Sequence, residues 1–162
     1  MEKTGRSYRS IEKELFIKAT PQSVFRALTE KAELERWYLT KAELDLRPGG
    51  AISFEWDRTR GVYNFGKILA LEPPHRLSYT WEALEPSPTT ITFELNAEND
   101  GTRLHLTHTG IGEGEEWDHY YHSRNGGWSI HLANLIAWLE TGKATNQIER
   151  LQGKATKTGQ DS

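Results

Sequence analysis

Apolar and charged residues alternate near the start of the chain and predict a strand followed by two short helices. Ile11 to Lys18 has the alternation of a strand with one buried face. Thr20 and Pro21 suit the start of a helix, because threonine caps free N–H groups and proline fits the first helical position. A second short helix is expected over Ala32 to Trp37, with its apolar residues on one face.

From Ala42 to Thr109 the apolar residues recur at every second position, which predicts six strands. Residues typical of turns separate these strands at short intervals. The expected turns and loops are Arg47–Gly50, Asp57–Gly61, Pro73-Pro74, Glu82–Pro88 and Asn99–Gly101. Short connections join antiparallel neighbours, so this part of the chain is expected to form a meander with one buried face.

A long helix is predicted over Glu116 to Gly142. Large apolar residues recur there at helical spacing, and Gly142 is a typical helix end. Gly126 and Gly127 lie inside this helix, where each glycine costs about 1 kcal/mol relative to alanine. That cost predicts a close backbone approach or a bend at this point.

Together these elements predict one α+β domain. One strand, two short helices, six strands and one long helix have to share a single core. A curved antiparallel sheet wrapped around the long C-terminal helix is the compact solution for this order. The expected organisation is a flexible N-terminus (1–9), the domain itself (10–142) and a polar C-terminal tail (143–162).

Composition and charge narrow the classes of function. The chain has 162 residues, which suits one domain, and its formal net charge of −3 offers no basic surface for nucleic acid. It contains no cysteine, so disulfides, thiolate metal sites and cysteine nucleophiles are excluded. No apolar run approaches the roughly 20 residues that span a membrane. We therefore expect a cytoplasmic protein that is a monomer or a homodimer.

A series of short motifs covers most of residues 11–142. The motifs are Ala19-Thr20-Pro21 with Val24–Thr29, Leu34 with Trp37, Asp45–Gly50, Gly66 with Ile68, Pro73-Pro74 with Leu77, Thr80-Trp81, Thr92–Leu95, Gly101–His108 and Gly127-Trp128. In this order they resemble the START-like (SRPBCC) superfamily, most closely the branch related to the C-terminal domain of the activator of the heat-shock-protein-90 ATPase. The resemblance implies a helix-grip fold with a cavity between the concave face of the sheet and the long helix. Members of the superfamily carry lipids, sterols and polyketides, and some are cyclases, so a hydrophobic ligand is implied here.

Large or polar residues on the inward faces are the candidates for contact with such a ligand. They are Trp37, Phe54, Trp56, Tyr79, Trp81, Phe93, His108, Tyr121, Arg124 and Trp128. Ligand pockets are mainly apolar with a few placed polar groups, and this set has that composition. The alternative for each aromatic residue is that it fills a solid core, because protein interiors are closely packed.

Two of these candidates carry polar chemistry. His108 shares a face with Leu104 and Leu106 and is expected to point inward. A neutral imidazole there can orient a ligand, act as a general base or bond to a neighbour. Arg124 lies on the buried stripe of the long helix and can bind a carboxylate through its guanidinium fork. The alternatives for Arg124 are an ion pair with a carboxylate of the sheet and a side chain that reaches solvent.

No metal, cofactor or catalytic site is predicted. Glu116, His119 and His122 are spaced by three residues along the long helix, but their stripe is offset from the buried one and is expected to face solvent. The glycines of Gly110–Gly114 lack the spacing of a dinucleotide-binding loop. This loop is interpreted as a flexible rim at the mouth of the cavity.

Three functions remain open. The first is binding of a hydrophobic small molecule in the cavity, oriented by His108, Arg124 or Tyr121. The second is a cyclase- or hydrolase-like enzyme that uses the same cavity, with His108 as the base. The third is a chaperone-associated or regulatory protein-interaction module without a ligand. The eukaryotic activator contacts its chaperone through an additional N-terminal domain, for which 162 residues leave no room.

Overall fold

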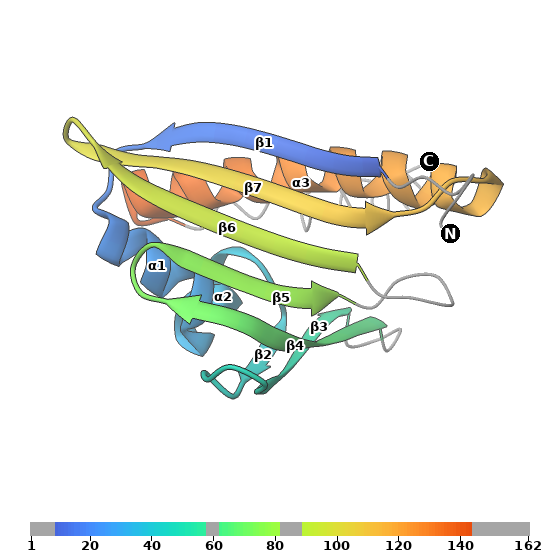
Figure 1. The fold of residues 1–162 in the computed structure, drawn as a ribbon. Helices are drawn as coiled ribbons and strands as arrows, with labels where there is room; N and C mark the ends of the chain where they lie inside the picture. Colours follow the sequence, from blue (N-terminus) through green and yellow to red (C-terminus); the bar gives the residue numbers. More distant parts are fainter. Residues whose placement is uncertain (1–8, 58–61, 82–88, 144–162) are drawn as a thin grey trace, which may run out of the picture.

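The described part of the chain forms a seven-stranded antiparallel sheet and three helices in the order that the sequence predicts (Figure 1). This computed structural model describes residues 9–57, 62–81 and 89–143. The elements are β1 (Arg9–Ile17), α1 (Pro21–Thr29), α2 (Lys31–Trp37), β2 (Lys41–Leu44), β3 (Ala51–Asp57), β4 (Val62–Glu72), β5 (Arg76–Trp81), β6 (Thr89–Glu98), β7 (Gly101–Ile111) and α3 (Glu115–Thr141). The predicted α+β class, the six-stranded meander and the long C-terminal helix are confirmed.

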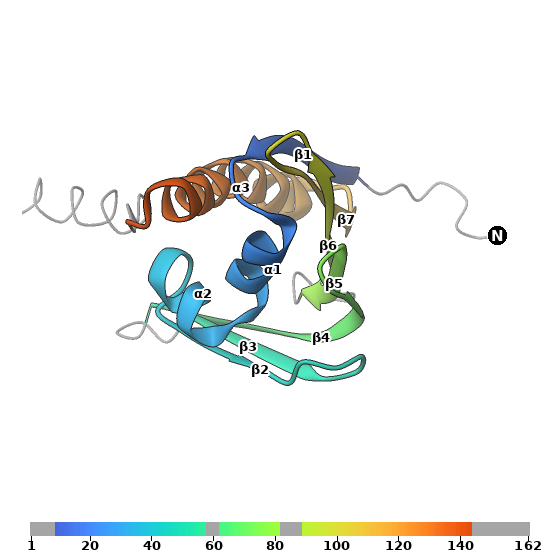
Figure 2. The same ribbon diagram turned by 90° about the vertical axis from the view of Figure 1, so that its left-hand side faces the viewer.

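The order of strands in the sheet is β1-β7-β6-β5-β4-β3-β2, so the first strand lies beside the last. In this pairing Ile11 is opposite His108 and Leu15 is opposite Leu104. Figure 2 shows the sheet curving from β1 and β7, beside α3, to β2, β3 and β4 on the far side, with α1 and α2 inside the curve. A curved sheet that encloses helices in this way is the predicted helix-grip arrangement.

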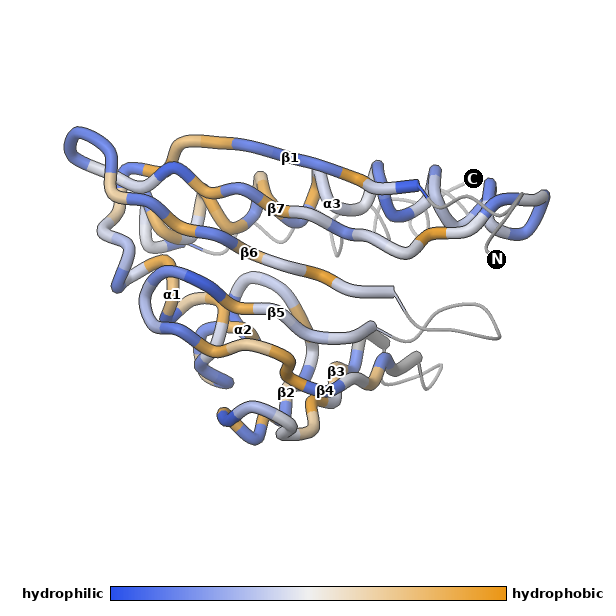
Figure 3. The backbone as a smooth tube through the Cα atoms, viewed as in Figure 1, coloured by the Kyte–Doolittle hydropathy of each residue, from blue (hydrophilic) through white to orange (hydrophobic). Residues whose placement is uncertain are grey.

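The core lies between the concave face of the sheet and the helices. Along the strands apolar and polar residues alternate (Figure 3), and the apolar ones face the helices. The backbone of α3 packs closest to β1, β7, α1 and α2. It meets the more distant strand β6 through side chains, for example where the ring of Trp128 contacts that of Phe93. Large residues therefore line the layer between α3 and strands β3 to β6 from both sides.

The cap at the start of α1 is present as predicted and gives a stability test. The backbone N–H of Ser23 donates to Thr20 Oγ1 at 3.1 Å. Removing the cap with Thr20→Ala is expected to lower the free energy of unfolding by about 1 kcal/mol, because one helix N–H loses its partner. Urea denaturation measures this difference. The control is Gln22→Ala, an exposed residue in the same turn, which is expected to change stability by less than about 0.5 kcal/mol.

Helix α3 runs without interruption through its two glycines, so the predicted close backbone approach is wrong. A Cβ atom built on Gly126 has no neighbour within 4 Å, and one built on Gly127 meets only His131 Nε2, at 3.9 Å. The helix ends at Gly142 as predicted, in the left-handed conformation (φ 74°), with the Gly142 N–H bonded to the Trp138 carbonyl. The Cβ position of Gly126 thus faces open space, and that of Gly127 is in ordinary contact range of His131.

Arg9 joins the start of β1 to the start of α3. Its Nε and Nη2 atoms donate to the carbonyl oxygen of Gly112 at 3.1 and 2.7 Å, and its Nη1 pairs with Asp118 at 2.8 Å. The loop predicted as a flexible rim is held by these contacts, and its first two residues belong to β7. Residues 1–8 of the predicted N-terminal segment and residues 144–162 of the predicted tail lie outside the described part of the chain.

Candidate functional site

Five aromatic residues form a closed circuit of contacts between α3 and the sheet. Tyr38 follows α2, Phe54 is on β3, Tyr79 on β5, Phe93 on β6 and Trp128 on α3. Taken in this order and back to the first, neighbouring ring centroids are 6.0, 6.1, 6.3, 5.9 and 6.3 Å apart. We call these five residues the aromatic circuit. Residues from four strands and helices, and from the turn after α2, thus line one region of the interior.

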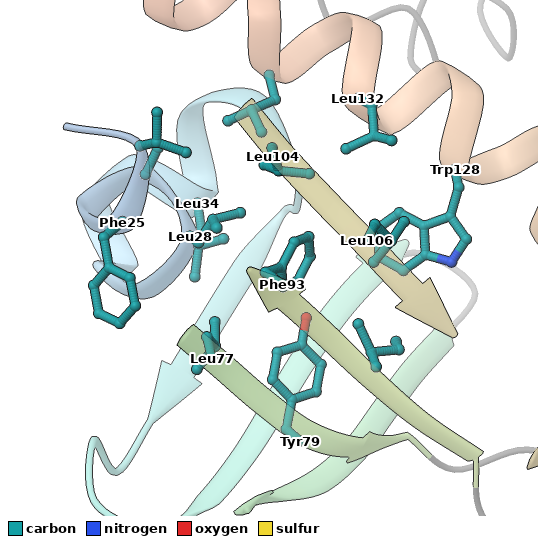
Figure 4. Packing of buried hydrophobic residues seen from close by; sticks show 14 of the residues in the cluster. Phe25, Leu28, Leu34, Leu77, Tyr79, Phe93, Leu104, Leu106, Trp128 and Leu132 are labelled. Atoms are coloured by element: carbon teal, nitrogen blue, oxygen red, sulfur yellow. The ribbon is translucent and has the colours of Figure 1, made fainter. Parts of the chain in front are cut away.

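Figure 4 shows how the two layers meet at this region. Trp128 and Leu132 project from α3 toward Phe93 and Leu106 on the sheet, and the hydroxyl of Tyr79 points away from its strand into the same layer. Tyr79 is only 3 % exposed, and its burial raises the pKa of its phenol. The Tyr79 hydroxyl thus places a polar group in a layer that is otherwise lined by rings.

His108 is tied into a chain of hydrogen bonds next to the aromatic circuit. Trp128 Nε1 donates to His108 Nδ1 at 3.0 Å. Because the indole N–H can only donate, Nδ1 must accept, and the proton of the neutral imidazole lies on Nε2. That Nε2–H is 2.7 Å from Thr89 Oγ1, whose own hydroxyl donates to the Trp81 carbonyl at 3.2 Å. Both ring nitrogens of His108 thus have partners inside the protein.

This arrangement argues against His108 as a general base. A base needs a free lone pair, and the one on Nδ1 is occupied by the Trp128 N–H. Burial, together with the positive charge of Arg124, lowers the pKa of His108 from 6.5 to about 3. A group with that pKa has little affinity for a proton near neutral pH. The geometry favours the alternative that His108 orients its neighbours.

Arg124 lies on the face of α3 that is turned toward the sheet. It is half-buried, and it stands one helical turn from both Tyr120 and Trp128. Both of these neighbours contact His108, with Tyr120 Oη 3.4 Å from His108 Nε2. The Arg124 charge also contributes to lowering the pKa of the buried His131. The guanidinium group is therefore close to the polar end of the site.

Gly127 lies one turn before His131 on α3. It is partly exposed, whereas its neighbours Trp128 and His131 are 3 % and 4 % exposed. The absence of a side chain leaves the position of its Cβ with no contact closer than 3.9 Å. The ring of His131 contacts Tyr38 and Trp128, at centroid distances of 4.8 and 5.6 Å. The His131 ring beside Gly127 thus contacts two members of the aromatic circuit.

A family model described as "Activator of Hsp90 ATPase homolog 1-like protein" (AHSA1) matches residues 18–140. The chain belongs to this family. The resemblance drawn from the sequence motifs is thereby confirmed. AHSA1-like domains have the SRPBCC helix-grip fold. A comparison with curated proteins finds no match.

Solved structures share this fold over nearly their whole length. The Aha1 dimer from Colwellia psychrerythraea is 25% identical, with a TM-score of 0.74, over 83% of this chain and 98% of that one. Protein MLL2253 from Mesorhizobium loti is 26% identical, with a TM-score of 0.72, over 82% and 97% of the two chains. CalU16 from Micromonospora echinospora is 23% identical, with a TM-score of 0.67, over 92% and 90%, and supports the fold alone.

The structure of the AHSA1-like domain brings most of the predicted site residues together. The predicted residues Phe54, Tyr79, Trp81, Phe93, His108 and Trp128 are all buried in or beside the aromatic circuit. Arg124 is half-buried at its edge. The side chain of Trp56 lies outside the described part of the structure.

Two predicted residues have other contacts in this AHSA1-like domain. Trp37 donates its indole N–H to the Ala27 carbonyl at 2.9 Å and stacks on Tyr38. It therefore packs against a member of the aromatic circuit. Tyr121 lies under the Arg9 guanidinium, 4.9 Å from the ring centroid, at the start of α3. Tyr120, one residue earlier, is the tyrosine that reaches His108.

Four residues of the site were not among the predicted ones. Tyr120 and His131 have a signal in the sequence, because they fall four residues before Arg124 and three after Trp128 on the same helical face. Thr89 also has a signal, because it begins β6 and extends the alternation of Ile91 and Phe93 on the buried face. Tyr38 follows a short helix and has no periodic pattern that indicates its direction, so only the tertiary structure places it.

The outer face of α3 carries Glu116, His119 and His122, the three residues with the spacing of possible metal ligands. All three are exposed. Among the residues that the structure describes, no group of three or more histidine, aspartate or glutamate side chains could hold a metal ion.

No helix in the described ranges is both long and apolar enough to cross a membrane.

Proposed function

We propose that this AHSA1-like domain binds a hydrophobic, ring-containing small molecule between α3 and strands β3 to β6. The observation that carries the proposal is the aromatic circuit, whose five rings come from α3, from the turn after α2 and from three strands. Its flat apolar surfaces suit rings, which bind by stacked or edge-to-face contacts. Gly127 of α3 has no side chain and lies beside His131, whose ring contacts the circuit. The hydroxyl of Tyr79 adds a polar group in the same layer.

Binding without catalysis is the form that the site supports best. An enzyme in this layer needs a base or a nucleophile, and both nitrogens of His108 are already engaged. His131, the other buried histidine here, also has its pKa lowered to about 3, chiefly by burial. The polar groups that line the site are thus suited to orienting a ligand rather than to moving its protons.

The test fills the space at Gly127 and compares it with the solvent side of the same helix. N-Phenyl-1-naphthylamine is a neutral probe whose fluorescence rises in apolar surroundings, and we expect it to bind the wild-type domain. Gly127→Leu is expected to weaken binding at least tenfold, because the new side chain occupies the ligand's place. Gly126→Leu is the matched control, since Gly126 is exposed with nothing within 4 Å, and is expected to change binding less than about twofold.

Both variants gain helix propensity, about 1 kcal/mol, so neither is expected to unfold the domain. Native mass spectrometry of the purified wild-type protein gives an independent readout, because a bound apolar molecule adds a stoichiometric mass. If Gly127→Leu binds the probe as wild type does, or if no probe binds and the mass is that of the bare chain, the proposal is wrong. A measured mass equal to that of the chain without a ligand would instead favour a protein-interaction module.

A further inference from the structure

The charge of Arg124 has no partner on its own helix. Arg124 is the one lysine or arginine between Glu115 and Thr141. The positions three and four residues away on either side hold Tyr120, Tyr121, Gly127 and Trp128, none of which is acidic. The acidic residues of α3 are too far from Arg124 along the helix or have contacts with other groups.

Two of those acids have contacts at the ends of the helix. Asp118 pairs with Arg9, and Glu140 accepts from the backbone N–H of Lys18 at 2.9 Å. Across residues 9–57, 62–81 and 89–143, no carboxylate oxygen lies within 4.0 Å of the Arg124 guanidinium. The predicted alternative of an ion pair with a carboxylate of the sheet therefore finds no support in this part of the chain.

The surroundings of Arg124 favour a partner group that carries a single negative charge. A half-buried guanidinium is only partly hydrated, and its planar fork fits the two oxygens of a carboxylate. The buried histidines nearby stay neutral near pH 7, so they add no second positive charge. A dianion such as phosphate would bring an uncompensated negative charge next to apolar rings, which is costly.

Tyr120 can complete the recognition of such a group. Its hydroxyl is 3.4 Å from both Thr89 Oγ1 and His108 Nε2, and both distances are long for hydrogen bonds of an O–H group. Burial raises the pKa of this phenol, so it keeps its proton and can donate it to an acceptor. Tyr120 and Arg124 lie one turn apart, with Gly127 one turn further along.

From this geometry we infer that the ligand is a ring-containing carboxylic acid, bound as its monoanion with the carboxylate on Arg124 and the ring body beside Gly127 in the aromatic circuit. The inference rests on the proposed function and adds the polarity and orientation of the ligand. It places the acid group toward the N-terminal half of α3 and the apolar part toward Trp128 and His131.

The test uses two ligands that differ in charge alone. 1-Naphthylacetate and the neutral 1-naphthylacetamide have the same ring and nearly the same shape. Each is titrated against the domain loaded with N-phenyl-1-naphthylamine, and displacement of the probe gives its affinity at pH 7.5. The wild-type domain is expected to prefer the acid at least tenfold. In Arg124→Gln this preference is expected to vanish, while the affinity for the amide changes less than threefold.

Two further variants separate the carboxylate contact from general effects of charge. Arg124→Lys keeps the charge without the fork and is expected to retain part of the preference. Arg26→Gln removes the same charge from an exposed position on α1 and is expected to retain all of it. Equal affinity for acid and amide in the wild type, or a preference that survives Arg124→Gln, overturns the inference. In that case binding of the neutral probe shows that the proposed function still stands, and its absence shows that both fail.

Discussion

Replacing Trp128 by alanine is expected to lower the free energy of unfolding by about 4 kcal/mol, the largest effect of any single substitution considered for this domain. The side chain is 3 % exposed, and its ring contacts those of Tyr38, Phe93 and His108. Its loss leaves a cavity and also leaves His108 Nδ1 without its donor, which adds the cost of an unsatisfied buried acceptor. Urea denaturation at pH 7.5 measures the difference.

Trp138 on the same helix is the matched control. It also makes one indole hydrogen bond, to Glu33 Oε1 at 2.7 Å, but it is only half-buried. Trp138→Ala is therefore expected to cost about 1–2 kcal/mol, and an equal loss in the two variants would contradict the role given to Trp128. If Trp128→Ala does not fold, Trp128→Phe keeps most of the ring, and we expect a cost of about 1–2 kcal/mol from the lost hydrogen bond.

Acid is expected to destabilise the domain steeply below pH 6.5. Burial, aided by the charge of Arg124, lowers the pKa of both His108 and His131 from 6.5 to about 3. The unfolded chain takes up both protons as the pH falls through 6.5, whereas the folded domain resists them. The stabilisation is therefore complete above pH 6.5 and is lost as the pH falls toward 3. When the pH falls from 7.5 to 5.0, each histidine is expected to lower the free energy of unfolding by about 2 kcal/mol.

Single substitutions show whether these two histidines carry the effect. His108→Gln and His131→Gln each remove one titrating group, so each is expected to reduce the loss of stability between pH 7.5 and 5.0 by about 2 kcal/mol relative to wild type. Urea denaturation of the three proteins at both pH values gives the comparison. Variants with the same pH dependence as wild type would show that the carboxylates are responsible instead.

Local signals in the sequence were sufficient for the architecture. The alternation in Ile11 to Lys18 indicates β1, and Thr20 with Pro21 fixes the start of α1 through a cap that needs no tertiary information. Period-two alternation and short turns predict the meander, because each strand pairs with the next one along the chain. The pairing of β1 with β7 joins distant parts of the chain, and no local pattern in the sequence indicates it.

The sequence predicts which residues form the site better than it predicts their contacts with one another. An inward direction follows from strand periodicity for Phe93 and His108, and both are buried as expected. Periodicity does not tell which nitrogen of His108 is occupied, because the donor comes from Trp128 on another element. The two glycines in α3 carry a cost in helix propensity, but the sequence does not tell what lies beside them. In the structure neither Cβ position has a contact closer than 3.9 Å.

The pairing of β1 with β7 has a consequence for how this domain is made. Ribosomes add about 5–20 residues per second, so roughly 5–20 s pass between completion of the two strands. Throughout that interval the apolar face of β1, with Ile11 and Ile17, has no partner strand, and the charged residues between them limit its aggregation. Contacts so distant along the chain also slow folding. The sheet can be completed only after β7 has been synthesised, when α3 is the next element to emerge.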